Sequence, residues 1–236
     1  MLLRNIKFWD GVSEDYGTEF DAIRITAAGT IALTSADDRS SGEPELDLAG
    51  AFVLPGLIDA HIHLCLDPDE SDPFAHGKVP AKDQLSAMGL RAKKMVQAGI
   101  TTARDLGGGQ WLELKVRDAI AAGEIDGPRL ICAGQPITSP GGHCHFWGGE
   151  ASDLAEALSV IERQAAAGVD LIKVMATGGN ITPGSKPSDA QFDQAKAEMD
   201  IGRAAFDAAE NSLAYTRIYA PFNGVVSNIF TEKHQT

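Results

Sequence analysis

Short apolar runs alternate with helix-like stretches between residues 57 and 175, and this alternation limits the fold more than any other feature of the sequence. The apolar runs occupy residues 57–64, 100–104, 128–133 and 171–175. The stretches between them carry apolar residues at helical spacing and end at Gly99, Gly123 and Gly168. Nearly continuous apolar strands that alternate with helices indicate a parallel sheet covered by helices. Four such βα units can be counted if the residues after 192 supply the fourth helix.

Residues 1–55 have a different pattern. Loosely alternating runs at 2–8, 22–26 and 46–54, with a short apolar run at 31–33, are separated by turn residues and by a polar stretch. We therefore expect a small β layer ahead of the βα units.

The composition excludes several classes of partner. The formal net charge of -13 argues against a nucleic-acid groove or an anionic membrane surface. Charge enters the sequence before a signal-peptide core could form, and no run is long and apolar enough to cross a bilayer, so we expect no membrane insertion. Three cysteines form an odd, sparse set, so no disulfide framework is indicated. The expected location is the cytoplasm.

Two histidines interrupt the first apolar run. Side chains at positions i and i+2 of a strand point to the same side, so His61 and His63 can face one point near the carboxyl end of that strand. Neutral imidazole is a common ligand of zinc and similar divalent ions. The alternative is a pair of surface or hydrogen-bonded histidines. The buried character of the strand favours a metal site with His61 and His63 as its first two ligands.

Four segments follow one another along the chain as a set of motifs: VLPGLIDAHIH at 53–63, AGITTARD at 98–105, SPGGH at 139–143 and LIKVMATGG at 171–179. Together they resemble the amidohydrolase superfamily, in its branch of prolidase-like and Xaa-Arg dipeptidase-like enzymes, which also contains imidazolonepropionase relatives. The resemblance covers roughly residues 1–192 and keeps the order of the family's motifs. It implies an α/β fold in which a β-sandwich part (residues 1–55) precedes an incomplete TIM-like (β/α) barrel of about four βα units (residues 56–192).

The resemblance implies a metal-ligating role for Lys173. In the family, the lysine of the fourth strand is carbamylated and bridges two divalent metals, for which zinc is the expected ion. A carbamate is an anionic oxygen ligand that suits dications, whereas an ammonium would be repelled. A lysine within an apolar strand also needs a partner, because lysine is rarely buried alone. The alternative is a lysine that extends from the strand end into solvent.

The glycine-rich segment after the third strand is expected to face the substrate. In the resembling enzymes a histidine of this loop contacts the substrate, which fits His143 better than His145. A second metal site that includes Cys144 is a weak alternative, since three consecutive residues cannot easily converge on one ion. A flexible polar loop is the other alternative.

Three further features are expected to be structural. Asp105 follows Arg104 and is expected in an ion pair at a strand end rather than in catalysis. His76 is expected to be solvated in a mobile loop. Residues 107–109 are three glycines without the lysine and spacing of a phosphate-binding loop, so we expect a βα turn.

The later part of the family's site has no counterpart in the sequence. A complete (β/α)₈ barrel needs about 250 residues, and the family's later histidines and its catalytic aspartate have no matching motif, so the catalytic residue is unknown. His234 lies outside any strand motif and is not assigned as a ligand. Residues 193–236, chiefly through YTRI and APFNGVV, resemble the helix and strand tail of periplasmic adaptor (membrane-fusion) proteins of efflux pumps. An ordinary helix and hairpin is the alternative.

Three functions therefore compete. The first is hydrolysis of an amide, peptide or cyclic amide C–N bond in a small or dipeptide-like substrate by a metal-activated water. The second is a truncated or chimeric, inactive fragment that keeps part of the metal site. Its half barrel would expose sheet edges and favour a homo-oligomer. The third is an adaptor-like binding protein that acts through its C-terminal helix.

Overall fold

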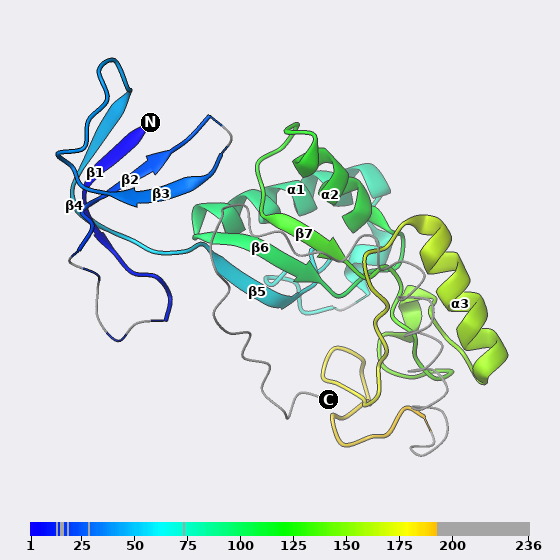
Figure 1. Cartoon of the computed structure of the whole chain (residues 1–236). Coiled ribbons are helices and arrows are strands. Elements are labelled where there is room, and N and C mark those ends of the chain that lie inside the picture. The colour runs from blue at the N-terminus through cyan, green and yellow to red at the C-terminus, as the bar shows by residue number, and fades with distance from the viewer. Residues whose placement is uncertain (13, 15–16, 18, 28, 73, 193–236) are drawn as a thin grey trace. The chain divides into compact units, whose positions relative to one another are not determined.

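The computed structural model describes residues 1–12, 14, 17, 19–27, 29–72 and 74–192 (Figure 1). The described residues divide into two compact units, residues 1–55 and residues 56–192. The adaptor-like tail expected at 193–236 lies outside the described residues.

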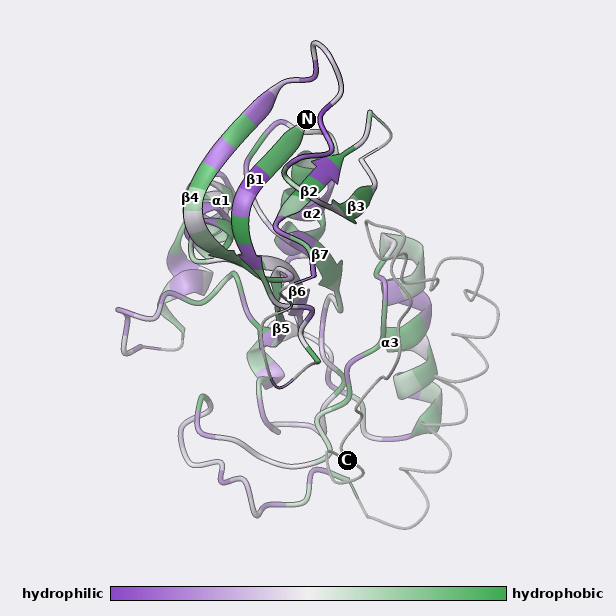
Figure 2. Cartoon of the chain, turned by 60° about the vertical axis from the view of Figure 1, so that its left-hand side comes forward, coloured by the Kyte–Doolittle hydropathy of each residue, from purple (hydrophilic) through white to green (hydrophobic). Residues whose placement is uncertain are grey.

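The first unit is a four-stranded sheet. Its strands are β1 (Leu2–Phe8), β2 (Ala22–Ile25), β3 (Ile31–Thr34) and β4 (Glu45–Val53), in the order β3-β2-β1-β4. β1 pairs parallel with β4, whereas the β1–β2 and β2–β3 pairs are antiparallel. Apolar and polar residues alternate along β4, as the colour bands of Figure 2 show. The alternation suits a sheet with one buried face. Leu2 of β1 and Ala22 of β2 are buried in the core of this unit. The small β layer expected from the sequence is confirmed.

The second unit begins with three parallel strands. They are β5 (Leu57–Ile62), β6 (Ile100–Asp105) and β7 (Arg129–Cys132), in the order β5-β6-β7. Helix α1 (Ala81–Gln97) connects β5 to β6, and α2 (Leu112–Ala121) connects β6 to β7. The loop after β7 contains the 3₁₀ turn η2 (His145–Trp147) and leads to α3 (Leu154–Ala167); a second 3₁₀ turn, η1 (Ala75–Lys78), precedes α1. None of the described helices is both long and apolar enough to span a membrane.

The fourth strand expected at 171–175 is reduced to a single bridge in the described residues. Val174 pairs parallel with Ile137. Ile137 N donates to Lys173 O at 2.8 Å, and Met175 N donates to Ile137 O at 2.8 Å. The segment thus lies beside the chain that continues from β7, in the place that a fourth strand would occupy. The fourth helix expected after residue 192 lies outside the described residues.

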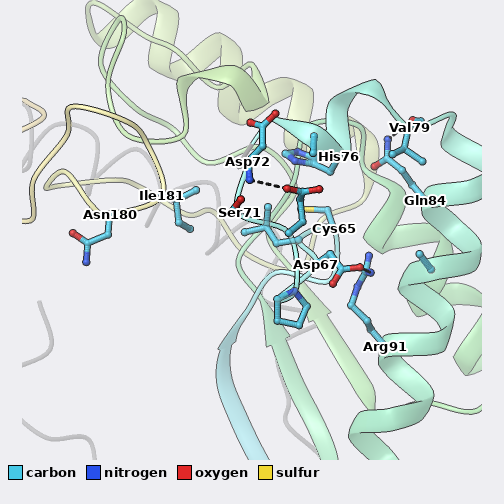
Figure 3. A pocket seen from close by; sticks show the side chains of 15 residues that line it. Cys65, Asp67, Ser71, Asp72, His76, Val79, Gln84, Arg91, Asn180 and Ile181 are labelled. Carbon is cyan, nitrogen blue, oxygen red and sulfur yellow. Dashed lines mark hydrogen bonds and ion pairs between the residues drawn. The ribbon is translucent and has the colours of Figure 1, made fainter.

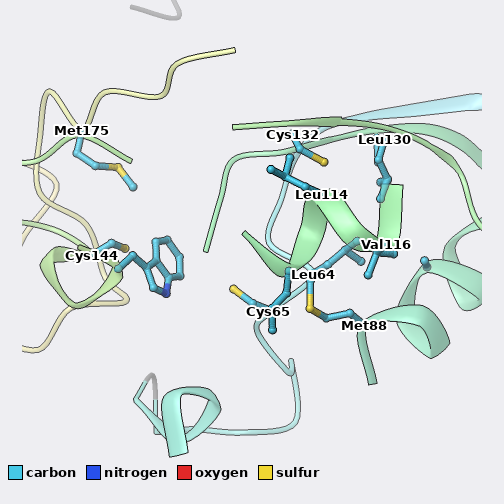
Figure 4. Packing of buried hydrophobic residues seen from close by; sticks show 13 residues of the cluster. Leu64, Cys65, Met88, Leu114, Val116, Leu130, Cys132, Cys144 and Met175 are labelled. Atoms are coloured by element: carbon cyan, nitrogen blue, oxygen red, sulfur yellow. The ribbon is translucent and has the colours of Figure 1, made fainter. Parts of the chain in front are cut away.

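The core of the second unit lies between the sheet and its helices. Met88 and Ala92, one helical turn apart on α1, are fully buried and pack with Leu114 of α2 and Leu130 of β7 (Figure 4). Full burial of an apolar side chain of this size contributes about 1.5–3 kcal/mol. All three cysteines are buried and free. The polar residues His61 and Asp105 lie at the carboxyl ends of β5 and β6.

Candidate functional site

Four residues expected in the site lie close to one another. Burial, and next the positive charge of Lys173, lower the pKa of His61 and of His143. Lys173 also contributes to the lowered pKa of His63. Such a charge acts over about 10 Å. Lys173 is therefore close enough to His61, His63 and His143 for its charge to act on each of them.

The end of β5 presents its two histidines as neighbours. The ring centroids of His61 and His63 are 5.3 Å apart. His61 is exposed, whereas His63 is largely enclosed. Burial lowers the pKa of His63 to about 4, with smaller contributions from the surrounding cationic groups. Both imidazoles are therefore neutral near pH 7, which is the form that ligates metals.

A backbone carbonyl orients the His63 ring. His63 Nδ1 lies 2.9 Å from Gly107 O. A carbonyl oxygen only accepts hydrogen bonds, so Nδ1 carries the proton and Nε2 keeps its lone pair. Trp147 packs against the other side of the site, with its ring centroid 5.0 Å from that of His63.

Lys173 is half-buried on the segment that pairs with Ile137. Burial lowers its pKa, and the charge of Arg104 lowers it further. Both effects disfavour the ammonium form. A neutral amine at this place is the form that can react with carbon dioxide to give a carbamate.

His143 is buried against the glycines that follow Lys173. A Cβ added to Gly179 would lie 2.4 Å from His143 Nε2, so the ring needs a glycine there. The backbone N–H of His143 donates to Gln191 Oε1 at 2.6 Å. Its side-chain Nδ1 is buried and has no hydrogen-bond partner among the described residues.

The neighbours of His143 have different surroundings. The ring of His145 is near Gly142 O, at 3.0 Å from Nδ1, and packs against Phe146. Cys144 is buried, and burial raises the pKa of its thiol to about 12. A protonated thiol is a poor metal ligand, so the geometry gives no support to a second metal site at 143–145.

The donor set fits a divalent metal only if Lys173 contributes. Among the described residues, no group of three or more His, Cys, Asp or Glu side chains is placed to hold an ion. His61 and His63 supply two neutral imidazoles, and the carbonyl partner of His63 leaves Nε2 available. A carbamate on Lys173 would add the oxygen ligand that an ammonium cannot provide.

Two residues differ from their expected surroundings. Asp105 was expected in an ion pair, but its carboxylate accepts backbone N–H groups from Leu64 at 3.0 Å and Gly107 at 2.9 Å, while Arg104 donates to Ala60 O. His76 was expected to be solvated, but Trp147 Nε1 donates to its Nε2 at 2.9 Å. These partners come from loops far apart in the sequence, so no local pattern could have identified them or Trp147.

A cavity of about 450 Å³ lies beside the end of β5 (Figure 3). Its walls include Cys65 and Asp67 after β5, Arg91 of α1, and Asn180 and Ile181 after the Lys173 segment. The guanidinium of Arg91 lies 3.4 Å from the carboxylate of Asp67. A separate hollow of about 690 Å³ is lined by His61, His63 and residues of α1. Lys173 and His143 line neither space.

Comparison with known proteins gives one family and several relatives. Residues 52–207 match the Amidohydrolase family, which is more than half of the chain. Ochratoxinase of Aspergillus niger is 26% identical over 179 residues, which cover 65% of this chain and 37% of that enzyme.

Solved structures share the fold. A crystal structure of an amidohydrolase is 24% identical, with a TM-score of 0.76, and the match covers 89% of this chain and 54% of that one. A Xaa-Pro dipeptidase solved with methionine in its active site is 25% identical, with a TM-score of 0.71 and the same two coverages. This chain thus spans about half the length of these solved relatives. The likenesses confirm the expected fold class, a small β layer followed by part of a TIM-like barrel.

Proposed function

The chain belongs to the amidohydrolase family, and on that premise we propose that it takes part in metal-dependent hydrolysis of an amide, peptide or cyclic amide C–N bond. The observation that supports the proposal is that His61 and His63 lie at the carboxyl end of β5, which pairs parallel with β6, and that Lys173 is close enough for its charge to lower the pKa of both rings. Active sites of barrel enzymes lie at this end of the sheet.

His61 and His63 would hold a divalent ion, with zinc as the first candidate, through neutral imidazole nitrogens. Lys173 would provide a further ligand after its amine nitrogen bonds to the carbon of carbon dioxide and releases a proton, which leaves an anionic carbamate. When bound, the metal would supply Lewis-acid activation of the amide carbonyl and of water. The low pKa values of the two histidines support this assignment, because neither ring must lose a proton first.

His143 would contact the substrate. Its ring lies against Gly179, and its Nδ1 lacks a partner among the described residues. A buried polar atom without a partner costs free energy. A substrate carbonyl or carboxylate that accepts a hydrogen bond from this ring would remove that cost.

The substrate proposed is a small, dipeptide-like molecule. The hollow of about 690 Å³ that His61 and His63 line lies within the usual range of small-molecule sites. The names of the relatives support this class, since one is a Xaa-Pro dipeptidase with bound methionine and another is an ochratoxinase.

The test is metal-dependent turnover of a panel of dipeptides and N-acyl amino acids by the full chain, with zinc and bicarbonate supplied. We expect turnover in the wild type and its loss in Lys173→Met. Lys186→Met is the matched control, because Lys186 lies on the same loop and forms no part of the proposed ligand set. Turnover that survives Lys173→Met, or that is insensitive to a chelator, would contradict the proposal.

A second candidate is metal binding without turnover. The observation in its favour is that no group of three or more His, Cys, Asp or Glu side chains is placed to hold an ion among the described residues. It predicts zinc bound by the wild type together with no hydrolysis of any compound in the panel.

A further inference from the structure

We propose that Asp105 is a positioning residue that fixes the tautomer and direction of the His63 ring by holding both backbone segments that the ring depends on. This inference rests on the proposed role of His63 as a metal ligand. Asp105 ends β6 and is only 1% exposed, so its carboxylate lies in the core rather than in the candidate site.

The carboxylate joins two loops. Oδ2 accepts the N–H of Leu64 at 3.0 Å, which belongs to the peptide group that follows His63. Oδ1 accepts the N–H of Gly107 at 2.9 Å. The carbonyl of Gly107 is in turn the partner of His63 Nδ1 at 2.9 Å. Asp105 is thus linked to the His63 ring in two ways. One link is the Leu64 N–H, in the peptide group that follows His63, and the other is Gly107, whose carbonyl is the partner of the ring.

The position of Gly107 is restricted by its backbone conformation and by the close approach of Gly134. Its φ of +111° lies in the region that favours glycine, and a Cβ at this position would lie 2.0 Å from Gly134 O. The N–H of Gly108 donates to the same Gly134 oxygen at 3.0 Å. The carbonyl that orients His63 is therefore fixed by the β7 loop on one side and by Asp105 on the other.

The burial of the Asp105 carboxylate is unfavourable, and a positioning role accounts for it. Burial raises the pKa of Asp105 to about 6 in spite of two N–H donors, so the side chain costs free energy at this place. Hydrogen bonds that orient a metal-binding histidine are worth about 10–100-fold in metal affinity. An asparagine would keep the size of the side chain but would direct an NH₂ group at one of the two backbone N–H groups.

The decisive variant is Asp105→Asn, compared with the wild type and Glu113→Gln as full chains. Glu113 is 2% exposed and is close enough to Asp105 to feel its charge, but it bonds to the backbone of Gly134, whereas the Leu64 and Gly107 N–H groups donate to Asp105. In metal-free protein, long-range ¹H–¹⁵N spectra of the histidine rings should show His63 protonated on Nδ1 in the wild type and Glu113→Gln. Asp105→Asn should show a mixture of tautomers, and its zinc affinity should fall about 10–100-fold.

Two measurements keep the outcomes distinct. If the wild type binds no zinc, the proposed function fails, whereas the ring spectra still test the role of Asp105. If Asp105→Asn does not fold, hydrogen exchange of the wild type decides, since the Leu64 and Gly107 amides should be protected and His63 should be the Nδ1–H tautomer. Unprotected amides, an Nε2–H tautomer in the wild type, or an unchanged His63 tautomer in folded Asp105→Asn would overturn the inference.

Discussion

At the scale of single residues, burial decides which form of each titratable group is present. His63 is enclosed enough to have a pKa of about 4, so it is an uncharged base at neutral pH. Lys173 and His143 are shifted in the same direction, mainly by burial. The two histidines of β5 can therefore accept a dication without first releasing protons, whereas burial only shifts Lys173 towards its neutral form.

Replacement of His143 should reduce substrate turnover more than it reduces the stability of the fold. We expect His143→Ala to reduce kcat/KM by roughly 10–100-fold, the cost of one hydrogen bond to a charged or polarised group. His145→Ala is the matched control, since His145 faces Phe146 and Gly142 instead. Steady-state kinetics of both variants checks this, and an equal loss in the two would contradict the assignment of His143.

The buried Glu113 should make stability depend on pH. Burial, and next the charge of Asp105, raise its pKa from 4.5 to about 7. The folded state therefore holds a proton that the unfolded state releases, so the stabilisation is complete below about pH 4.5 and is lost as the pH rises to about 7. The shift corresponds to roughly 3 kcal/mol at most.

Urea unfolding between pH 4 and 8 checks this pH dependence. Asp105, whose pKa burial raises to about 6, adds a dependence of the same sign. Glu113→Gln should therefore lose the part that Glu113 contributes and keep that of Asp105, and the exposed Glu124→Gln should keep both. A free energy of unfolding that rises with pH in the wild type over that interval would be the wrong sign.

At the scale of elements, regular periodicity made the second unit predictable. The strands β5, β6 and β7 and the helices between them fall where the apolar runs and the closing glycines indicated. The i, i+2 spacing of His61 and His63 is compatible with ring centroids 5.3 Å apart, although His63 follows the last residue of β5. The fourth strand was less predictable, since pairing with Ile137 over a single bridge depends on the loop after β7.

The start of α3 depends on one side chain. Asp153 Oδ1 accepts the N–H of Glu156 at 2.9 Å, and the Glu156 carboxylate accepts the N–H of Ser152 at 2.7 Å. Asp153→Ala should lower the free energy of unfolding by about 1 kcal/mol, whereas Asp153→Ser should retain most of the cap. Urea unfolding of the two variants checks this, and equal losses would show that the cap contributes nothing.

At the scale of the whole molecule, β5 is the edge of its sheet among the described residues. Leu57 and Ile58 on this strand are 50% and 74% exposed. An exposed apolar edge favours pairing with another strand, so we expect the chain to self-associate through β5. Ile58→Lys should shift the chain towards monomer in size-exclusion chromatography with light scattering. Leu154→Lys, on exposed α3, should not; the reverse pattern would place the interface elsewhere.

Long-range partners account for what the sequence could not predict. Trp147 and His76 are 71 residues apart, and Asp105 reaches Leu64 across 41 residues. Such contacts depend on how loops at the carboxyl ends of different strands are fitted together, and hydrophobic periodicity carries no information about that. The shared site of His61, His63, His143 and Lys173 was instead expected from the resemblance to a family, because its motifs carry information that periodicity does not.

The most direct test of the account is zinc binding by equilibrium dialysis in the presence of bicarbonate, with the wild type beside His61→Ala/His63→Ala. Loss of both imidazoles leaves Lys173 without partners for an ion, so the double variant should retain no specific zinc while the wild type binds one or two ions. His145→Ala should bind as the wild type does. Equal zinc binding by the wild type and the double variant would contradict the metal centre on which the proposed hydrolysis depends.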